Sequence, residues 1–355
     1  MPGCARKKLL LRDQVQVVHC YTRCVRRAFL AGVDPFTGKD FSYRRDWIRD
    51  LLVQKAALFG IEAGFHVQMS NHLHLVLRTR PDVVKRWSKE KVVRNWLKIA
   101  RLKRGSEITD WEPDEQRVRM EMSNPQRVKR LRRRLSNVSW YMATLCENVA
   151  RRSNQEDGVT GKFFEQRYKL RDLADESAIL VCGIYVDLNQ IHAGEALTPE
   201  DSRFTSAYDR IQGRNALAAT DQDSPEQGGG QRDRWLCELT LDESSDVDVS
   251  QDACSATPWR ASDKGLLPIP LDDYLTLLDW TGRQVRQDKK GAIPAELAPI
   301  LQRLQINADN WLETISEFDS RFTHVVGRVE SMSKAAVRMG RRRLAGLLNA
   351  SRAFD

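Results

Sequence analysis

The chain has 355 residues, 41% of them hydrophobic, and a formal net charge of +9. This composition predicts a globular protein of one large or two modest domains. The seven cysteines include no Cys-x-x-Cys pair, which argues against a disulfide framework and a zinc ribbon, and no apolar run approaches membrane-spanning length. The N-terminal stretch lacks the apolar core of a signal peptide, so we expect a cytoplasmic protein with no membrane partner.

The positive charge is unevenly placed. Lysine and arginine crowd into the first 175 residues, and "RVKRLRRRL" (127–135) holds six basic residues in its first eight positions. An acidic stretch follows at roughly 221–252. A basic half beside an acidic segment predicts a polyanionic partner, most plausibly nucleic acid. The alternative for the charge run alone is a solvated helix face.

Hydrophobic periodicity predicts an alternation of strands and helices over the first 194 residues. Tight turning is expected around Ser70, and Gly60 and Gly194 are expected to end helices. In chain order we expect a strand at 15–24, a helix at 43–60, strands at 61–69 and 71–80, a basic amphipathic helix at 82–105, a charged insertion at about 105–136, a helix at 137–154, a strand at 161–173 and a helix at 175–194. This order predicts an α+β fold, in which a small antiparallel sheet carries its helices on one face.

The composition also predicts three parts along the chain. Residues 1–215 contain the predicted strands and helices and form the first part, with the charged insertion inside it. Residues 216–257 are polar, acidic and glycine-rich, which is typical of a flexible linker. Residues 258–355 contain several short amphipathic stretches and predict a C-terminal helical domain.

Two histidines, His72 and His74, stand one residue apart within "MSNHLHLVL" (69–77). Side chains alternate along a strand, so both imidazoles point to the same face while Leu73 points to the other. Two adjacent imidazoles make a poor core pair but a good platform for a metal ion. The alternative is a pair of structural histidines satisfied by hydrogen bonds within the sheet.

The helix at 175–194 offers the residues that such a platform lacks. Tyr185 and Asn189 are four residues apart in "YVDLNQIHAG" (185–194) and therefore share one helical face. If this helix packs over the sheet, the Asn189 amide can complete a three-ligand site, and Tyr185 can stand beside a metal-bound phosphate as nucleophile. The alternative for Tyr185 is a core residue.

Together these motifs resemble the HUH single-tyrosine transposases, which move single-stranded DNA. "SNHLHLVL" (70–77) resembles their histidine–hydrophobic–histidine motif, "YVDLNQIHAG" their tyrosine helix, and "GKFFEQRYKLRDL" (161–173) the strand before that helix. The nearest subgroup is that of the REP-associated tyrosine transposases in their long form, which "LDDYLTLLDWTGRQ" (271–284) also resembles. The resemblance covers roughly residues 15–212. Where the family usually has Asn-Pro, this chain has Asn189-Gln190.

The resemblance implies a ferredoxin-like or RRM-like catalytic domain and a role for each matching residue. His72, His74 and Asn189 would bind Mg²⁺ or Mn²⁺, and Tyr185 would attack the scissile phosphate, leaving a 5′-phosphotyrosine and a free 3′-hydroxyl. Covalent capture would conserve the phosphodiester energy, so the strand could be rejoined without ATP. The implied partner is single-stranded or hairpin DNA, and the implied setting is a bacterial-type, nucleoid-associated cytoplasmic protein that acts as a dimer or as a monomer.

Six basic residues are candidate DNA contacts: Arg23, Arg167, Lys169 and Arg171 on the strands near the histidines, and Arg130 and Arg133 in the charge run. The sequence thus predicts a metal-dependent DNA transposase or nickase. A domesticated nucleic-acid-binding protein without transposition activity is the alternative. A hydrolase with His-x-His at the end of a barrel strand is disfavoured, because the chain has only six histidines and the wrong order of strands.

Overall fold

A five-stranded sheet lies at the centre of the computed structural model, which describes residues 6–25, 29–35, 37–102, 111–220, 232–241, 255, 257–286 and 297–354. The strands are β1 (Gln16–Arg23), β2 (Ile61–Gln68), β3 (His72–Thr79), β4 (Lys169–Leu173) and β5 (Val325–Val326), in the order β2-β3-β1-β4-β5. The first four pair antiparallel, as expected, whereas β5 pairs parallel with β4. The fold is therefore α+β with a mixed open sheet, in which the C-terminal part supplies the edge strand.

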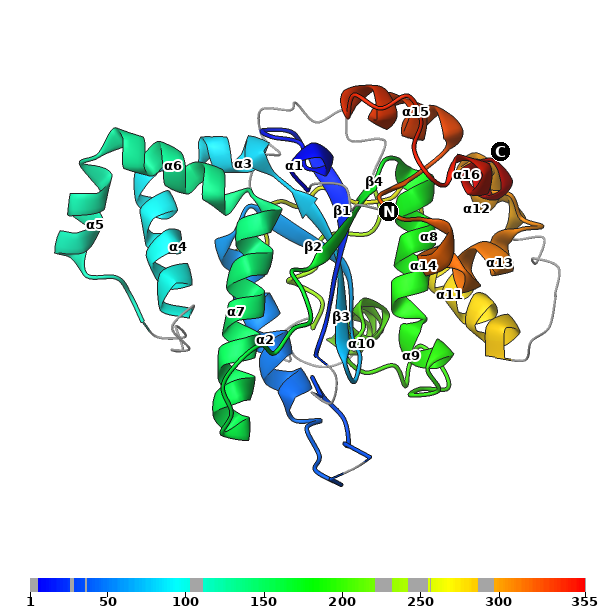
Figure 1. Cartoon of the computed structure of the whole chain (residues 1–355), viewed down its shortest axis with the longest axis horizontal. Coiled ribbons are helices and arrows are strands. Elements are labelled where there is room, and N and C mark those ends of the chain that lie inside the picture. Colours follow the sequence, from blue (N-terminus) through cyan, green and yellow to red (C-terminus); the bar gives the residue numbers. More distant parts are fainter. Residues whose placement is uncertain are drawn as a thin grey trace.

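Helices cover both faces of the sheet (Figure 1). On one side lie α2 (Arg44–Leu58) and α7 (Val138–Asp157), and on the other lies α8 (Glu176–Asp187). The expectation of helices on one face only was wrong. The physical reason is that β3 buries Leu73, Leu75 and Leu77 on one face and His74 and Val76 on the other, so both faces need cover.

Helix α8 packs closely on the sheet because one of its residues is a glycine. A Cβ atom at Gly183 would lie 2.6 Å from the ring of Phe65 on β2, so a larger residue would push the helix away. The helix begins at Asp175, whose carboxylate accepts the N–H of Ala178. It ends at Asp187, and a short helix α9 (Asn189–His192) follows, so the single helix expected over 175–194 is broken at Leu188. Gly194, at φ +71°, ends the segment as expected.

A buried carboxylate connects α8 to two other helices. Asp187 accepts hydrogen bonds from the Ser206 hydroxyl at 2.5 Å, the Ala207 N–H at 3.1 Å and the Tyr274 hydroxyl at 2.6 Å. These donors lie on α10 (Ser206–Thr220) and α11 (Leu271–Arg286). The carboxylate thus fixes the C-terminal end of α8, which carries the candidate site, against residues far away in the sequence.

Three predicted boundaries differ from the structure. The basic helix expected at 82–105 is divided into α3 (Pro81–Arg86) and α4 (Lys89–Leu102), because Trp87 is extended and the Ser88 hydroxyl caps α4 by accepting the Lys91 N–H. Of the strand expected at 161–173, only β4 (Lys169–Leu173) is a regular strand. Gly60 does not cap α2: the cap residue is Phe59, and Gly60 instead allows Val84 to approach its backbone.

The charged insertion and the N-terminal residues add short helices. Helices α5 (Glu115–Met122) and α6 (Pro125–Leu135) lie beside α4, on the α7 side of the sheet and farther from it (Figure 1). Helix α1 (Arg6–Leu9) packs near β4. The side chains of Asp114 and Asn124 cap α5 and α6, respectively.

The C-terminal residues pack on the α8 side of the sheet. Besides α11 they form α12 (Ala298–Arg303), α13 (Trp311–Ser316), α14 (Phe318–Arg321), α15 (Val329–Arg338) and α16 (Leu347–Phe354). Most of the expected linker at 216–257 lies outside the described residues, but 232–241 are described, and there Leu236 forms a bridge with Ala63 of β2. No helix in the described ranges has the length and apolarity to cross a bilayer.

A lysine buried between α2 and α7 gives a prediction about stability. The Nζ of Lys55 is fully buried, lies 2.8 Å from Thr144 Oγ1 and has no carboxylate partner among the described residues. Burial lowers the pKa of Lys55 from 10.5 to about 7. Between these values the unfolded chain binds the proton and the native protein does not, so the free energy of unfolding rises with pH across this window.

Replacing Lys55 with methionine should therefore raise the free energy of unfolding at pH 7 by roughly 2–4 kcal/mol, because a buried amine becomes apolar. In the Lys55→Met variant, the free energy of unfolding should rise less between pH 7 and pH 10 than it does in the native protein. Urea unfolding at several pH values would measure both effects, with Lys334→Met on the exposed face of α15 as the control. Equal pH profiles for Lys55→Met and the native protein would contradict the prediction.

Candidate active site

The two histidines of β3 meet the predicted helix on the sheet face that α8 covers. The ring centroids of His72 and His74 are 4.9 Å apart, and that of Tyr185 lies 5.8 Å from His74. Tyr21 and Arg23 of β1 pair with His74 and His72 in the register of the sheet. Thus the His-x-His motif, two residues of the first strand and the tyrosine of α8 lie at one place.

The partners of His72 leave one of its nitrogens available. Its Nδ1 lies 2.7 Å from Asn71 Oδ1, and because an amide oxygen can only accept, Nδ1 carries the proton and Nε2 keeps a lone pair. The side chain of Asn189 also lies close to His72. The Asn189 amide nitrogen donates to the Tyr185 carbonyl at 2.7 Å.

His74 is buried against a histidine from β1. Its Nδ1 lies 2.9 Å from Nε2 of His19, and one of these nitrogens must donate to the other. If His74 donates, its Nε2 keeps a lone pair, as a metal ligand requires. The competing tautomer is favoured by Arg171, whose Nη1 lies 3.4 Å from His19 Nδ1, a long contact. Burial lowers the pKa of both His72 and His74, so both rings are neutral near pH 7.

This donor set fits a divalent cation. The Nε2 atom of His72 and the side-chain oxygen of Asn189 each keep a lone pair that a cation can accept. Two neutral imidazoles and an amide oxygen are ligands that Mn²⁺ accepts and that Mg²⁺ accepts less well. The described residues contain no group of three His, Cys, Asp or Glu side chains able to hold a metal, so a site at this place would need the Asn189 amide as its third ligand.

Tyr185 is enclosed by residues from the C-terminal part of the chain. Its ring stacks on Phe318 of α14, with centroids 4.7 Å apart, and its side chain is 8% exposed. Its hydroxyl forms a hydrogen bond with the carboxylate of Asp319. Burial first, and then the negative charge of Asp319, raise the pKa of Tyr185. The phenol is therefore protonated at neutral pH, and Asp319 is the acceptor beside it.

A cavity of about 400 Å³ opens beside these residues. Four of the six predicted DNA contacts line it, namely Arg23, Arg167, Lys169 and Arg171. Arg171 differs from the others because it is buried and its guanidinium donates to Asp319 Oδ1 at 2.7 Å and to the Phe322 carbonyl at 2.8 Å. The other two, Arg130 and Arg133, lie on α6 on the opposite side of the sheet.

Several residues of the site were not predicted from the sequence. His19 of β1 bonds directly to His74. The sequence did contain a sign that His19 belongs to the site: His19, Tyr21 and Arg23 stand at every second position of β1 and therefore share one face. Asn71 could have been predicted as a site residue because it directly precedes His72 in the sequence. No pattern in the sequence connects Phe318 and Asp319 with Tyr185.

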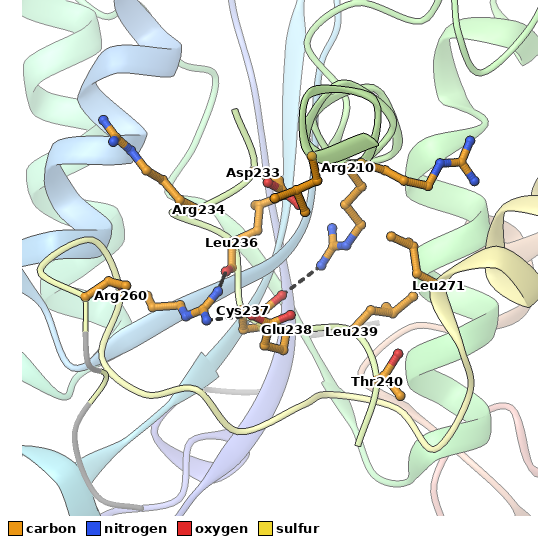
Figure 2. A pocket seen from close by; sticks show the side chains of 13 residues that line it. Arg210, Asp233, Arg234, Leu236, Cys237, Glu238, Leu239, Thr240, Arg260 and Leu271 are labelled. Carbon is orange, nitrogen blue, oxygen red and sulfur yellow. Dashed lines mark hydrogen bonds and ion pairs between the residues drawn. The ribbon is translucent and has the colours of Figure 1, made fainter. Parts of the chain in front are cut away.

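A second cavity, of about 250 Å³, lies between α10 and residues 232–241 (Figure 2). Arg210 donates to the carbonyl of Cys237, and Arg260 donates to the carbonyl of Leu236 and to the carboxylate of Glu238. These bonds hold 232–241 against its neighbours. The guanidinium of Arg234 points away from Arg210 in Figure 2, and that of Arg214 pairs with Asp272, so the arginines do not converge on one ligand.

Comparisons with protein-family models, with curated proteins and with solved structures give no match.

Proposed function

We propose that the protein is a metal-dependent DNA strand transferase that uses Tyr185 as its nucleophile. The observation that supports this most strongly is the meeting of His72, His74, Tyr185 and Asn189, two strand residues and two helix residues that are distant in sequence. Buried histidines alone would not require a tyrosine and an amide beside them. The candidate substrate is a single strand with a hairpin or palindromic element, as the resemblance implies.

The order of the strands is consistent with this proposal. Strands β1 to β4 follow the order β2-β3-β1-β4 with antiparallel pairing, and helices lie between β1 and β2 and between β3 and β4. This is the connectivity of the split βαβ motif. We therefore propose a ferredoxin-like core to which α8 and β5 are added.

In the proposed reaction the phenolic oxygen of Tyr185 attacks a phosphodiester phosphorus. The new bond joins phosphorus to Tyr185, the bond from phosphorus to the 3′-oxygen breaks, and that oxygen leaves as a 3′-hydroxyl after gaining a proton. The Tyr185 proton passes to Asp319, the carboxylate that its hydroxyl already contacts. Arg23, Arg167 and Lys169 line the cavity and would hold the flanking phosphates.

His72, His74 and Asn189 would hold a Mg²⁺ or Mn²⁺ ion, and the ion would polarise a non-bridging oxygen of the phosphate. All of these residues and Tyr185 belong to one chain, so a monomer contains every group that the proposal needs. A dimer that exchanges tyrosine helices is not required for the geometry. Cytoplasmic, nucleoid-associated placement remains part of the same proposal.

One observation favours the alternative of a binding protein without strand transfer. Tyr185 is nearly covered by Phe318, and burial raises its pKa, whereas an efficient nucleophile needs an accessible and easily ionised phenol. A binding protein would need only the basic cavity. The two proposals differ in a covalent product, so they can be separated directly.

The test is to incubate the protein with 5′- and 3′-labelled hairpin single strands in Mn²⁺, Mg²⁺ or EDTA and to resolve the products on denaturing gels. We expect a protein–DNA adduct and a free 3′-hydroxyl fragment with metal, and loss of both with EDTA. Native gels of the same samples should show that DNA remains bound without metal. Tight binding with no adduct on any strand would favour the binding protein.

A further inference from the structure

The charge run expected to contact nucleic acid forms most of helix α6, where three of its basic side chains have no partner within the part of the chain that the structure describes. Arg127 pairs with Glu121, Arg132 donates to the carbonyls of Val84, Lys85 and Trp87, and Arg134 packs on two tryptophan rings. In contrast, Lys129, Arg130 and Arg133 are exposed and make no hydrogen bond or ion pair with the described residues.

These three side chains form a single basic strip. Positions 129, 130 and 133 lie on one side of the helix, opposite the buried Val128, Leu131 and Leu135. Like charges one turn apart destabilise a helix, and among the described residues no carboxylate offsets them here. A partner that brings closely spaced negative charge would remove this repulsion.

A surface cavity of about 550 Å³ begins where the strip ends. It is lined by Trp96 of α4, Arg134 of α6 and Trp140 of α7. The Arg134 guanidinium lies 4.1 Å from the centroid of the Trp140 ring and 5.0 Å from that of Trp96. Arg133 of the strip and Arg134 of the cavity are consecutive residues of α6, so the two features adjoin. Aromatic rings and a guanidinium plane are surfaces on which unpaired bases stack.

We propose that the α6 strip (Lys129, Arg130 and Arg133) and the Trp96–Arg134–Trp140 cavity together bind single-stranded DNA, with backbone phosphates on the strip and a base in the cavity. The surface lies on the α7 side of the sheet, whereas α8, whose Tyr185 contacts His74, covers the other side (Figure 1). It therefore holds DNA away from the proposed point of cleavage. The choice of DNA as the partner rests on the proposed function; the charge and the rings themselves require a single-stranded polyanion with aromatic bases.

The test measures binding in EDTA, where no cleavage is expected, by fluorescence anisotropy with a labelled single strand over a range of salt. We expect the double variant Arg130→Gln/Arg133→Gln to lose about 5- to 30-fold in affinity, and its plot of log K against log salt to become shallower by roughly 1.4, since each phosphate contact to a single strand contributes about 0.7. A matched control is Arg283→Gln/Lys334→Gln, which removes the same charge from exposed positions of α11 and α15.

A second variant tests the cavity. Trp140→Ala should reduce the preference for single strand over the matching duplex by about 5-fold or more, while circular dichroism shows an unchanged fold. Unchanged affinity of the α6 double variant, an equal loss in the control, or binding to anionic phospholipid vesicles but not to DNA would overturn the proposal. If the native protein binds through this surface but forms no adduct, the proposed function fails and this inference stands; if an adduct forms and the α6 variant binds normally, only this inference fails.

Discussion

Replacing Tyr185 with phenylalanine is expected to abolish the covalent protein–DNA adduct, lowering its rate of formation by on the order of 10³-fold or more. The phenolic oxygen is the atom that would bond to phosphorus, and no other hydroxyl of a described tyrosine makes the same contact with Asp319. The ring would keep its stacking on Phe318 and its contact with His74. The measurement is the adduct band on denaturing gels, with labelled hairpin single strands and Mn²⁺.

Two controls make this result specific. DNA affinity in EDTA should change little, because the ring stays in place and the basic residues of the cavity are untouched. Tyr168→Phe removes a hydroxyl that bonds to Ser139, outside the candidate site, and should leave the adduct unchanged. An adduct formed by Tyr185→Phe at the native rate would show that another residue is the nucleophile.

Replacing His72 or His74 with alanine should reduce cleavage by on the order of 10³-fold while sparing most DNA affinity. Each change removes one of two neutral imidazoles, and the remaining imidazole with the Asn189 oxygen would hold a divalent cation poorly. Isothermal titration with Mn²⁺ should show weaker binding in both variants. This readout does not depend on the reaction and therefore separates loss of metal from loss of chemistry.

His19→Gln is the matched comparison, because it alters a neighbour of His74 without removing a proposed ligand. We expect weaker metal binding than in the native protein but stronger than in His74→Ala, since His19 positions the His74 ring. If His72→Ala cleaves DNA as well as the native protein, the metal role of this pair is refuted. If all three variants bind Mn²⁺ equally, the cation site lies elsewhere.

Much of the sheet and the core of the candidate site can be predicted from local patterns. Alternation places His72 and His74 on one face, and the four-residue spacing of Tyr185 and Asn189 places both over that face, as the structure confirms. Both patterns depend on local backbone geometry, because each joins residues at most four positions apart, and the break at Leu188 between Tyr185 and Asn189 is short. The period of a strand or helix and the spacing of residues along it are sufficient to predict which side chains share a face.

Other features depend on contacts between distant segments, and local patterns do not contain them. Phe318 and Asp319 reach Tyr185 only because α14 packs near α8, and β5 is too short for a periodic signal. The break between α3 and α4 could be predicted in part, since Ser88 is of a type that commonly caps the N-terminus of a helix. The sequence of β2 includes Glu62, His66 and Gln68, so it did not show that the whole strand is buried between helices on both faces of the sheet.

The central claim is that an α8 phenol, standing beside the β3 imidazoles, becomes bonded to DNA. The most direct measurement is mass spectrometry of the adduct after protease and nuclease digestion. We expect the nucleotide mass on the peptide that contains Tyr185, joined through a 5′-phosphate. A nucleotide on any other residue, or no modified peptide from a reaction in which the DNA was cut, would contradict this account.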